Sequence, residues 1–161
     1  MKTLILYATK YGAAAEVARR IADRMGGAAL HNLKGSPPDL GEFDCVVIGS
    51  AVYAGTIRKE AKEFLSRNAE ALRGKALGLF LSGMAPGDEK ACLEANFSPE
   101  MLQSAKAARN LGGIYDPQKV NALERLVMKA ASKMTTASEQ TGYADAIDDA
   151  KIAQFAQEMG A

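Results

Sequence analysis

One stretch near the start of the chain, residues 2–25, restricts the fold more than any other. It opens with the apolar run 3–8, passes through the short segment 9–12 (TKYG) and continues into 13–25. In that last part apolar residues recur at helical spacing: Ala14, Val17, Ala18, Ile21, Ala22 and Met25. The pattern predicts a buried strand, a tight turn and a helix. The first N–H groups of such a helix face the carboxyl end of the strand and favour an anion such as phosphate.

The rest of the chain continues this alternation. We expect further strands at 28–33, 45–49 and 76–81, with a weaker one at 112–115. Helical patterns occupy 57–72, 89–107 and the end of the chain from about 148. The sequence therefore predicts an α/β fold: a doubly wound five-stranded parallel sheet of order 2-1-3-4-5 with helices on both faces. We expect one domain over 1–161, with a helical insert at about 117–142 between strand five and the last helix.

This strand order makes the first, third and fourth strands neighbours. The loops that follow them, at 9–14, 50–55 and 82–87, each contain glycine and should meet at the carboxyl edge of the sheet, where such folds bind ligands. Response-regulator receivers share the topology, but they need acidic residues at the ends of the first and third strands. Here those ends read Tyr7-Ala8-Thr9 and Gly49-Ser50-Ala51, so the receiver interpretation has no support.

The turn after the first strand matches neither the P-loop nor the dinucleotide glycine pattern. Its Thr9-x-x-Gly12 resembles the phosphate loop of flavodoxins, with Ala14 where that pattern has a second hydroxyl. Residues 49–58 (GSAVYAGTIR) resemble the second flavin-binding loop of the flavodoxin superfamily, and 81–84 (LSGM) resemble the third. The segment from 115 to 134, followed by a final helix, is similar to the branch that contains menaquinone-dependent protoporphyrinogen oxidase.

The resemblance implies FMN held noncovalently by three loops. The expected phosphate contacts are Thr9, Lys10, Tyr11, Gly12, Ala13 and Ala14, and the expected ring contacts are Ala51, Val52, Tyr53, Ala54, Gly55, Ser82, Gly83 and Met84. Tyr53 is the candidate for stacking on the ring and Gly55 for a close backbone approach. The missing hydroxyl at Ala14 should cost ~1.5–3 kcal/mol of binding, which weakens the affinity without abolishing it.

Three functions fit these loops. The first is a flavin oxidoreductase that oxidises an organic donor such as protoporphyrinogen and passes the electrons to a quinone. The second is a one-electron carrier between redox partner proteins, and the third is a module that binds a phosphate-bearing ligand without turnover. No serine-histidine-acid set or pair of carboxylates surrounds the loops, so we expect no catalytic acid or base from the protein. The donor, the acceptor and the oligomeric state stay open.

Net charge, hydropathy and the cysteine and histidine content restrict the classes of partner, location and site that the chain can have. The formal net charge of +1 gives no support to nucleic-acid binding and differs from the acidic surfaces usual in flavodoxin shuttles. No apolar run approaches the ~18 residues needed to span a bilayer, and the N-terminus is unlike a signal peptide, so we expect a cytoplasmic protein. Cys45 and Cys92 form no C-x-x-C or ligand cluster, which predicts neither a disulfide nor a metal site. His31, the only histidine, falls on the expected edge strand and should be structural.

The insert carries a second pattern. Over 117–134 apolar residues share one helical face, and the other face carries basic side chains: Lys119, Arg125, Lys129 and Lys133. A basic amphipathic helix of this kind can lie on an anionic membrane, where it would reach a quinone. However, the chain after 137 is acidic and the apolar face lacks tryptophan and phenylalanine. We therefore favour a helix that covers the edge of the sheet over peripheral membrane contact.

Overall fold

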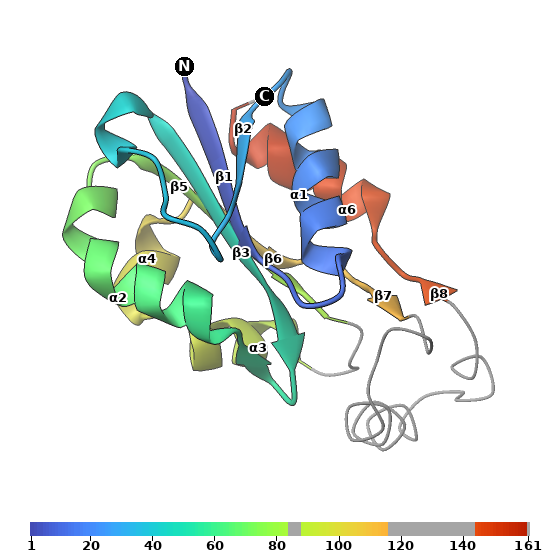
Figure 1. The fold of residues 1–161 in the computed structure, drawn as a ribbon. Coiled ribbons are helices and arrows are strands. Elements are labelled where there is room, and N and C mark those ends of the chain that lie inside the picture. Colours follow the sequence, from blue (N-terminus) through green and yellow to red (C-terminus); the bar gives the residue numbers. More distant parts are fainter. Residues whose placement is uncertain (84–87, 116–143, 161) are drawn as a thin grey trace.

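A computed structural model describes residues 1–83, 88–115 and 144–160, and its centre is a parallel sheet (Figure 1). The strands of this sheet are β1 (Thr3–Ala8), β2 (Ala29–Asn32), β3 (Cys45–Tyr53), β5 (Ala76–Ser82) and β6 (Ala107–Asn110). They lie in the order β2-β1-β3-β5-β6, so the predicted order 2-1-3-4-5 is confirmed. The short strand β4 (Thr56–Ile57) pairs antiparallel with the end of β3.

Helices cover both faces of the sheet, as predicted. In Figure 1, α1 (Ala13–Arg24) and α6 (Asp149–Glu158) lie side by side on one face. The helices of the other face are α2 (Lys59–Leu72), α3 (Glu89–Asn96) and α4 (Pro99–Ser104). A single 3-10 turn, η1 (Leu40–Glu42), precedes β3.

Two apolar layers, one on each face, explain why the central strands are apolar throughout. On the α2 side Leu4 and Ile48 pack in one buried cluster, and on the α1 side Ile5 packs with Ile21 and Phe155 in the other. All five of these side chains are at most 1% exposed. Successive residues of a strand point to opposite faces, so each layer takes alternate residues of the same apolar run.

The fifth strand lies elsewhere than the sequence pattern predicted. We expected it at 112–115, but the strand beside β5 is β6, in register with Gly78 opposite Ala107. Residues Ile114–Tyr115 instead form β7, which pairs antiparallel with β8 (Ala144–Asp145). An edge strand has a partner on one side only, so β6 tolerates polar residues such as Arg109, whose guanidinium donates to Glu158 at 2.9 Å. Because of these polar residues, the segment lacks the apolar run by which the other strands were predicted.

Two other boundaries also differ from the predictions. The third strand was expected to end at Gly49 but continues to Tyr53. The helix expected over 89–107 is interrupted: Ser98 caps the N-terminus of α4, its hydroxyl accepting from the N–H of Met101 at 3.2 Å, and Pro99 starts that helix. Ile57, expected on the following helix, belongs to β4 and is buried.

The expected insert helix at 117–134 and loop residue Met84 lie outside the described residues. The final helix begins close to the expected position, with the Asp148 carboxylate accepting from the N–H of Lys151. Within the described ranges, no helix combines the length and the apolar character that crossing a membrane requires. The same part of the chain contains no group of histidine, cysteine, aspartate or glutamate side chains placed to hold a metal.

Candidate functional site at the carboxyl edge of the sheet

The loop between β1 and α1 has the geometry of an anion-binding turn. Gly12 is the N-cap of α1 and has a left-handed backbone, with φ at 99°. Its N–H donates to the hydroxyl oxygen of Thr9 at 2.9 Å, which closes the turn and leaves the Thr9 O–H able to donate outward. No side chain caps α1, so the first N–H groups of the helix are directed at the space beyond the loop. A Cβ added at Gly12 would meet nothing within 4 Å, so the backbone is uncrowded beside this glycine.

Ala14 occupies the core instead of the surface of this loop. Its side chain is fully enclosed and packs in the apolar cluster between α1 and the sheet. Ala13, by contrast, is half-buried. Ala14 can therefore offer an anion only its backbone N–H.

Charged side chains beside this loop compensate one another. Glu16, in the first turn of α1, accepts hydrogen bonds from Arg19 at 2.7 Å and from Arg20 at 3.0 Å. These contacts, the Arg19 hydrogen bond first, lower the pKa of Glu16 to about 2. Arg20 also reaches Asp145 and Asp149, which ties α1 to β8 and α6. A carboxylate so close to an anion site would repel the anion, and its two guanidinium partners offset that charge.

The second loop is a tight hairpin at the end of β3. Val52 pairs with Ile57 and Tyr53 with Thr56, which leaves Ala54 and Gly55 as a two-residue turn. Their φ angles are 52° and 78°, so both central residues are left-handed, as in a type I′ hairpin. Glycine adopts this conformation readily, whereas alanine is strained in it. The loop predicted at 50–55 is thus mostly strand, with a turn of two residues.

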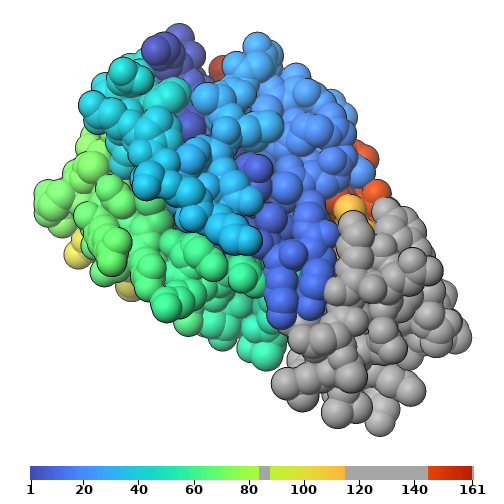
Figure 2. All heavy atoms as spheres, viewed as in Figure 1, coloured from blue at the N-terminus to red at the C-terminus, as the bar shows by residue number. Residues whose placement is uncertain are grey.

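The first and second loops touch through their tyrosines. The rings of Tyr11 and Tyr53 meet edge to face, with centroids 6.2 Å apart and planes at 90°. The ammonium of Lys10 lies 5.2 Å from the centroid of the Tyr11 ring. Figure 2 shows the loops after β1 (blue) and β3 (blue-green) next to each other on the surface. The predicted phosphate residues and the predicted stacking residue are therefore brought together.

Two polar side chains fix the second loop in place. The Ser50 hydroxyl accepts from the N–H of Arg58 at 2.9 Å and donates to the carbonyl of Ala51 at 2.8 Å. Asn96, at the end of α3, reaches the hairpin from another element: its Oδ1 accepts from the N–H of Ile57, and its Nδ2 donates to the carbonyl of Gly55. Asn96 could not be found from the sequence, because it lies on a helix about 40 residues after this loop and carries no motif.

The third loop follows β5 and is held by the end of β6. The Ser82 side chain is buried, and its hydroxyl donates to the carbonyl of Gly112 at 2.8 Å. The N–H of Gly83 donates to Oδ1 of Asn110 at 3.3 Å, and the N–H of Gly112 donates to the same oxygen at 3.1 Å. A Cβ at Gly83 would lie 3.3 Å from Cβ of Val52, so the second and third loops are also in close contact. Asn110 was not predicted as a site residue, because β6, the strand that it ends, was not predicted either.

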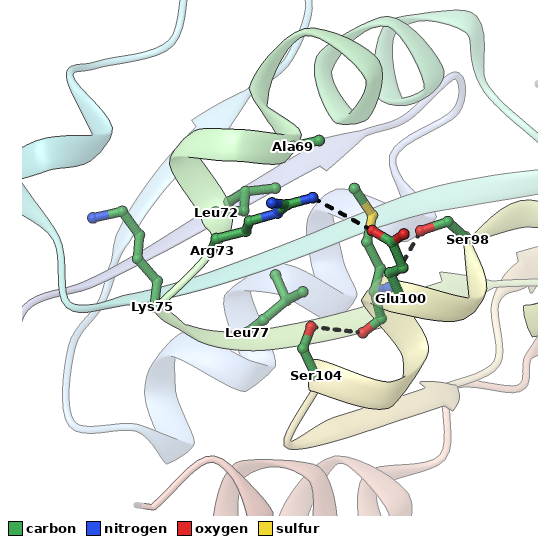
Figure 3. Close-up of a pocket in the computed structure, with 10 residues that line it drawn as sticks. Ala69, Leu72, Arg73, Lys75, Leu77, Ser98, Glu100 and Ser104 are labelled. Carbon is green, nitrogen blue, oxygen red and sulfur yellow. Dashed lines mark hydrogen bonds and ion pairs between the residues drawn. The ribbon is translucent and has the colours of Figure 1, made fainter.

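The remaining candidates are the histidine, the two cysteines and a surface hollow. His31 is on the edge strand β2, where its Nε2 is 3.1 Å from the carbonyl oxygen of Gly35. Cys45 is buried and Cys92 half-buried, and burial raises the pKa of both thiols. A hollow of about 250 Å³ opens between α2 and α4, near the start of β5 (Figure 3). Two cations line it: Arg73 is paired with Glu100 at 3.6 Å, and Lys75 donates to the carbonyl of Phe43 at 2.8 Å.

The fold and the three loops define a protein of the flavodoxin type. A family model described as a flavodoxin domain matches residues 4–142, and the chain belongs to this family. Among curated proteins, no sequence matches the chain significantly.

Solved structures show the same fold at low sequence identity. Oxidised flavodoxin 1 from Bacillus cereus is 17% identical, with 99% of this chain and 97% of that chain covered and a TM-score of 0.63. A WrbA-like flavodoxin from Agrobacterium tumefaciens is 14% identical, with 98% and 96% covered and a TM-score of 0.52. The Flv1 flavodiiron core from Synechocystis sp. PCC6803 is 18% identical, with 68% of this chain and 30% of that chain covered and a TM-score of 0.54.

Proposed function

We propose that this protein binds FMN at the three loops after β1, β3 and β5 and transfers electrons through it. The observation that carries the proposal is the uncapped first turn of α1 behind a left-handed Gly12, with the Tyr53 hairpin in contact through Tyr11. A helix N-terminus without a side-chain cap attracts phosphate, and an aromatic side chain beside it suits a planar ring. Membership of the flavodoxin-domain family supports the same cofactor. FMN, when bound, supplies the electron-transfer chemistry.

The phosphate would be held mainly by backbone groups. The Gly12 N–H donates to the Thr9 hydroxyl oxygen, so the donors would be the Thr9 O–H and the N–H groups in the first turn of α1, those of Ala13 and Ala14 among them. The ammonium of Lys10, exposed on the same loop, adds positive charge. Because Ala14 has no hydroxyl, we expect weaker phosphate binding than a loop with two hydroxyls would give.

The isoalloxazine ring would lie beside the second and third loops. Tyr53 and Val52 are half-buried at the end of β3 and offer it an aromatic and an apolar surface. The turn at Ala54–Gly55 is exposed and brings backbone within reach of the polar edge of a ring. Ser82 would contribute mainly its backbone, because its side chain is buried and its hydroxyl donates to the carbonyl of Gly112. The proposed role of Met84 rests on the sequence alone.

The protein itself offers little acid or base chemistry here. The His31 ring on β2 lies against the carbonyl of Gly35, and the carboxylate beside the phosphate loop, Glu16, is bonded to Arg19 and Arg20. We therefore assign to the described residues the binding and orientation of the cofactor and the exclusion of water from it, and no proton transfer.

For the redox partners, we propose electron transfer to a partner protein or a quinone. The finer hypothesis is oxidation of an organic donor such as protoporphyrinogen with a quinone acceptor, supported by the sequence resemblance beyond the fifth strand. A flavodoxin-type carrier between proteins is the alternative, and the near-neutral charge, +1, favours it less than an acidic surface would. Peripheral membrane contact through 117–134 and a cytoplasmic location remain proposals from the sequence.

Titration of the FMN-free protein with FMN tests the proposal. Flavin fluorescence should be quenched in a saturable way at one equivalent. Absence of binding at millimolar FMN would overturn the proposed function and favour a phosphate-ligand module.

The choice of donor and acceptor needs a separate measurement. The FMN-loaded protein is mixed anaerobically with a porphyrinogen and a soluble naphthoquinone, and porphyrin is followed by its fluorescence. Multiple turnovers would support the oxidase hypothesis. No porphyrin above the protein-free rate, together with rapid electron exchange with a flavodoxin reductase, would support the carrier.

A further inference from the structure

Asn96 holds the second loop from outside it. The residue ends α3, a helix packed on the face of the sheet opposite α1. Its Oδ1 accepts from the N–H of Ile57 at 2.9 Å, and its Nδ2 donates to the carbonyl of Gly55 at 2.9 Å and to that of Cys92 at 2.8 Å. One amide group thus bonds a donor and an acceptor on either side of Thr56 and anchors both to the body of the helix.

The loop needs such support. Ala54 has a φ of 52°, and no other residue apart from glycine has a positive φ in the described ranges. A left-handed alanine is strained, so the neighbouring contacts must hold the turn in this conformation. Ser50 fixes the helix side of the loop through the N–H of Arg58. Only Asn96 reaches the turn itself among the side-chain hydrogen bonds seen in the described part of the chain.

The burial of the contact makes it costly to lose. Ile57 is 3% exposed, so its N–H would have poor access to water if Oδ1 were removed. The carbonyl of Gly55 would be free to rotate, because the turn around it is exposed and contains glycine. Without the Asn96 amide, the peptide groups around Gly55 should therefore no longer be held in one orientation.

We propose that Asn96 is the positioning residue of the flavin loop: it orients the peptide groups of Gly55 and Ile57 and so prepares the hairpin for the ring. This inference rests on the proposed function, because it takes the hairpin as a flavin contact. A loop held in its bound conformation loses less entropy on binding, and that difference appears as affinity. Asn96 acts through the loop and does not itself touch the cofactor.

Three variants test the assignment. Asn96→Ala removes both loop contacts. Asn96→Asp keeps an oxygen for the N–H of Ile57 but replaces the donor to Gly55 with an acceptor that repels its carbonyl. Asn68→Ala is the matched control: Asn68 is also half-buried on a helix, α2, and donates to the carbonyl of Phe64 four residues earlier, at 2.9 Å, without a hydrogen bond to any of the three loops.

Two readouts separate a role at the loop from general stability. In Asn96→Ala the Kd for FMN should rise about tenfold, the factor that 1.4 kcal/mol produces, and the Ile57 amide should exchange with solvent at least about tenfold faster. Asn96→Asp should show the weaker FMN binding with the Ile57 amide still protected. The visible circular dichroism of bound FMN should change in both. Asn68→Ala should stay within about twofold of the wild type in Kd and exchange.

The outcomes are distinguishable. Equal loss of FMN affinity in Asn96→Ala and Asn68→Ala would overturn the proposal, because it would indicate general destabilisation. Unchanged affinity in both Asn96 variants would also overturn it. If the alanine variant fails to fold, the aspartate variant decides alone. If the wild type binds no FMN, the proposed function and this role in FMN binding are both wrong. If the wild type binds FMN but the Ile57 amide of Asn96→Ala exchanges at the wild-type rate, only the role of Asn96 is contradicted.

Discussion

The ring of Tyr11 lies edge to face against the ring of Tyr53, with the two centroids 6.2 Å apart. Tyr11 belongs to the loop after β1 and Tyr53 ends β3, two strands that are neighbours in the sheet. The contact therefore couples the proposed phosphate loop to the proposed ring loop. Aromatic pairs of this geometry contribute about 0.5–1.5 kcal/mol beyond the area they bury.

Replacing Tyr53 tests this coupling. Tyr53→Ala should raise the Kd for FMN about tenfold or more, because it removes both the proposed stacking surface and the contact with Tyr11. Tyr53→Phe keeps the ring and should stay within about threefold of the wild type. The measurement is a fluorescence titration with FMN. Equal affinities for the alanine variant and the wild type would contradict a ring contact at Tyr53.

The left-handed glycine at the start of α1 gives a second prediction. Gly12→Ala should weaken FMN binding about tenfold or more, because alanine disfavours the φ of 99° that directs the turn. Gly26→Ala is a matched control at the other end of α1, with a φ of 76° and equally open space around an added Cβ. Both variants should lose about 1 kcal/mol of unfolding free energy. If Gly26→Ala weakens FMN binding as much, the Gly12 turn is not the phosphate site.

The pH dependence of stability should report on Glu16. The pKa of this carboxyl in the folded protein, about 2, is below its ordinary value of 4.5. Ionised Glu16 therefore stabilises the fold above pH 4.5, and this contribution is lost as the pH falls towards 2. Glu16→Gln should lower the unfolding free energy by about 1 kcal/mol at pH 7, after allowance for screening by solvent, and the difference from the wild type should vanish near pH 2.

Urea unfolding at several pH values measures this difference. Glu63→Gln serves as the control, since Glu63 is exposed and its ion pair with Lys59 is longer, at 3.8 Å. A Glu16→Gln difference that stays constant from pH 7 to pH 2 would show that the contacts with Arg19 and Arg20 do not hold the carboxylate ionised.

Gly49 explains one boundary that the sequence pattern missed. The third strand was expected to end at Gly49, yet it continues to Tyr53, and Gly49 lies inside it opposite Phe80 of β5. An added Cβ would lie 2.0 Å from the Phe80 ring, so this glycine makes room for an aromatic side chain. Close packing of this kind cannot be recognised from one strand, because it depends on which residue the neighbouring strand places beside it.

A substitution measures this packing. Gly49→Ala should lower the unfolding free energy by about 2–3 kcal/mol through overpacking. Gly35→Ala, where the nearest atoms would be 3.9 Å away, should change it by less than about 0.5 kcal/mol. Urea denaturation gives both values. A tolerated Gly49→Ala would mean that Phe80 can move aside.

The parts of the fold that the sequence predicted are those with local signals. The apolar runs of β1, β3 and β5 and the helical spacing in α1 and α6 follow from burial alone, and the strand order follows from alternating strands and helices. β6 was missed because Arg109 and Asn110 satisfy an edge position with polar contacts. The break before α4 had a signal in the sequence, Ser98-Pro99. This pair is typical of a helix start and argues against a single long helix over 89–107.

In the candidate site, too, residues in local patterns were predicted and residues that act from distant parts of the chain were not. Thr9, Gly12 and Tyr53 could be proposed from the sequence because their types and spacing belong to a loop pattern. Asn96 and Asn110, which hold the second and third loops, were not, since each acts on a loop about 30 or 40 residues away in the chain through contacts that only the folded sheet creates. At Ala14 the sequence showed a missing hydroxyl, and the structure adds that the alanine side chain lies in the core.

The most direct test of the FMN site is an amide NMR titration of the isotopically labelled FMN-free protein with FMN. We predict large, saturable shifts for Gly12, Ala13, Gly55 and Gly83, with little change at Gly74 beside the hollow between α2 and α4. Shifts centred on Gly74, or none in the three loops at saturating FMN, would contradict it.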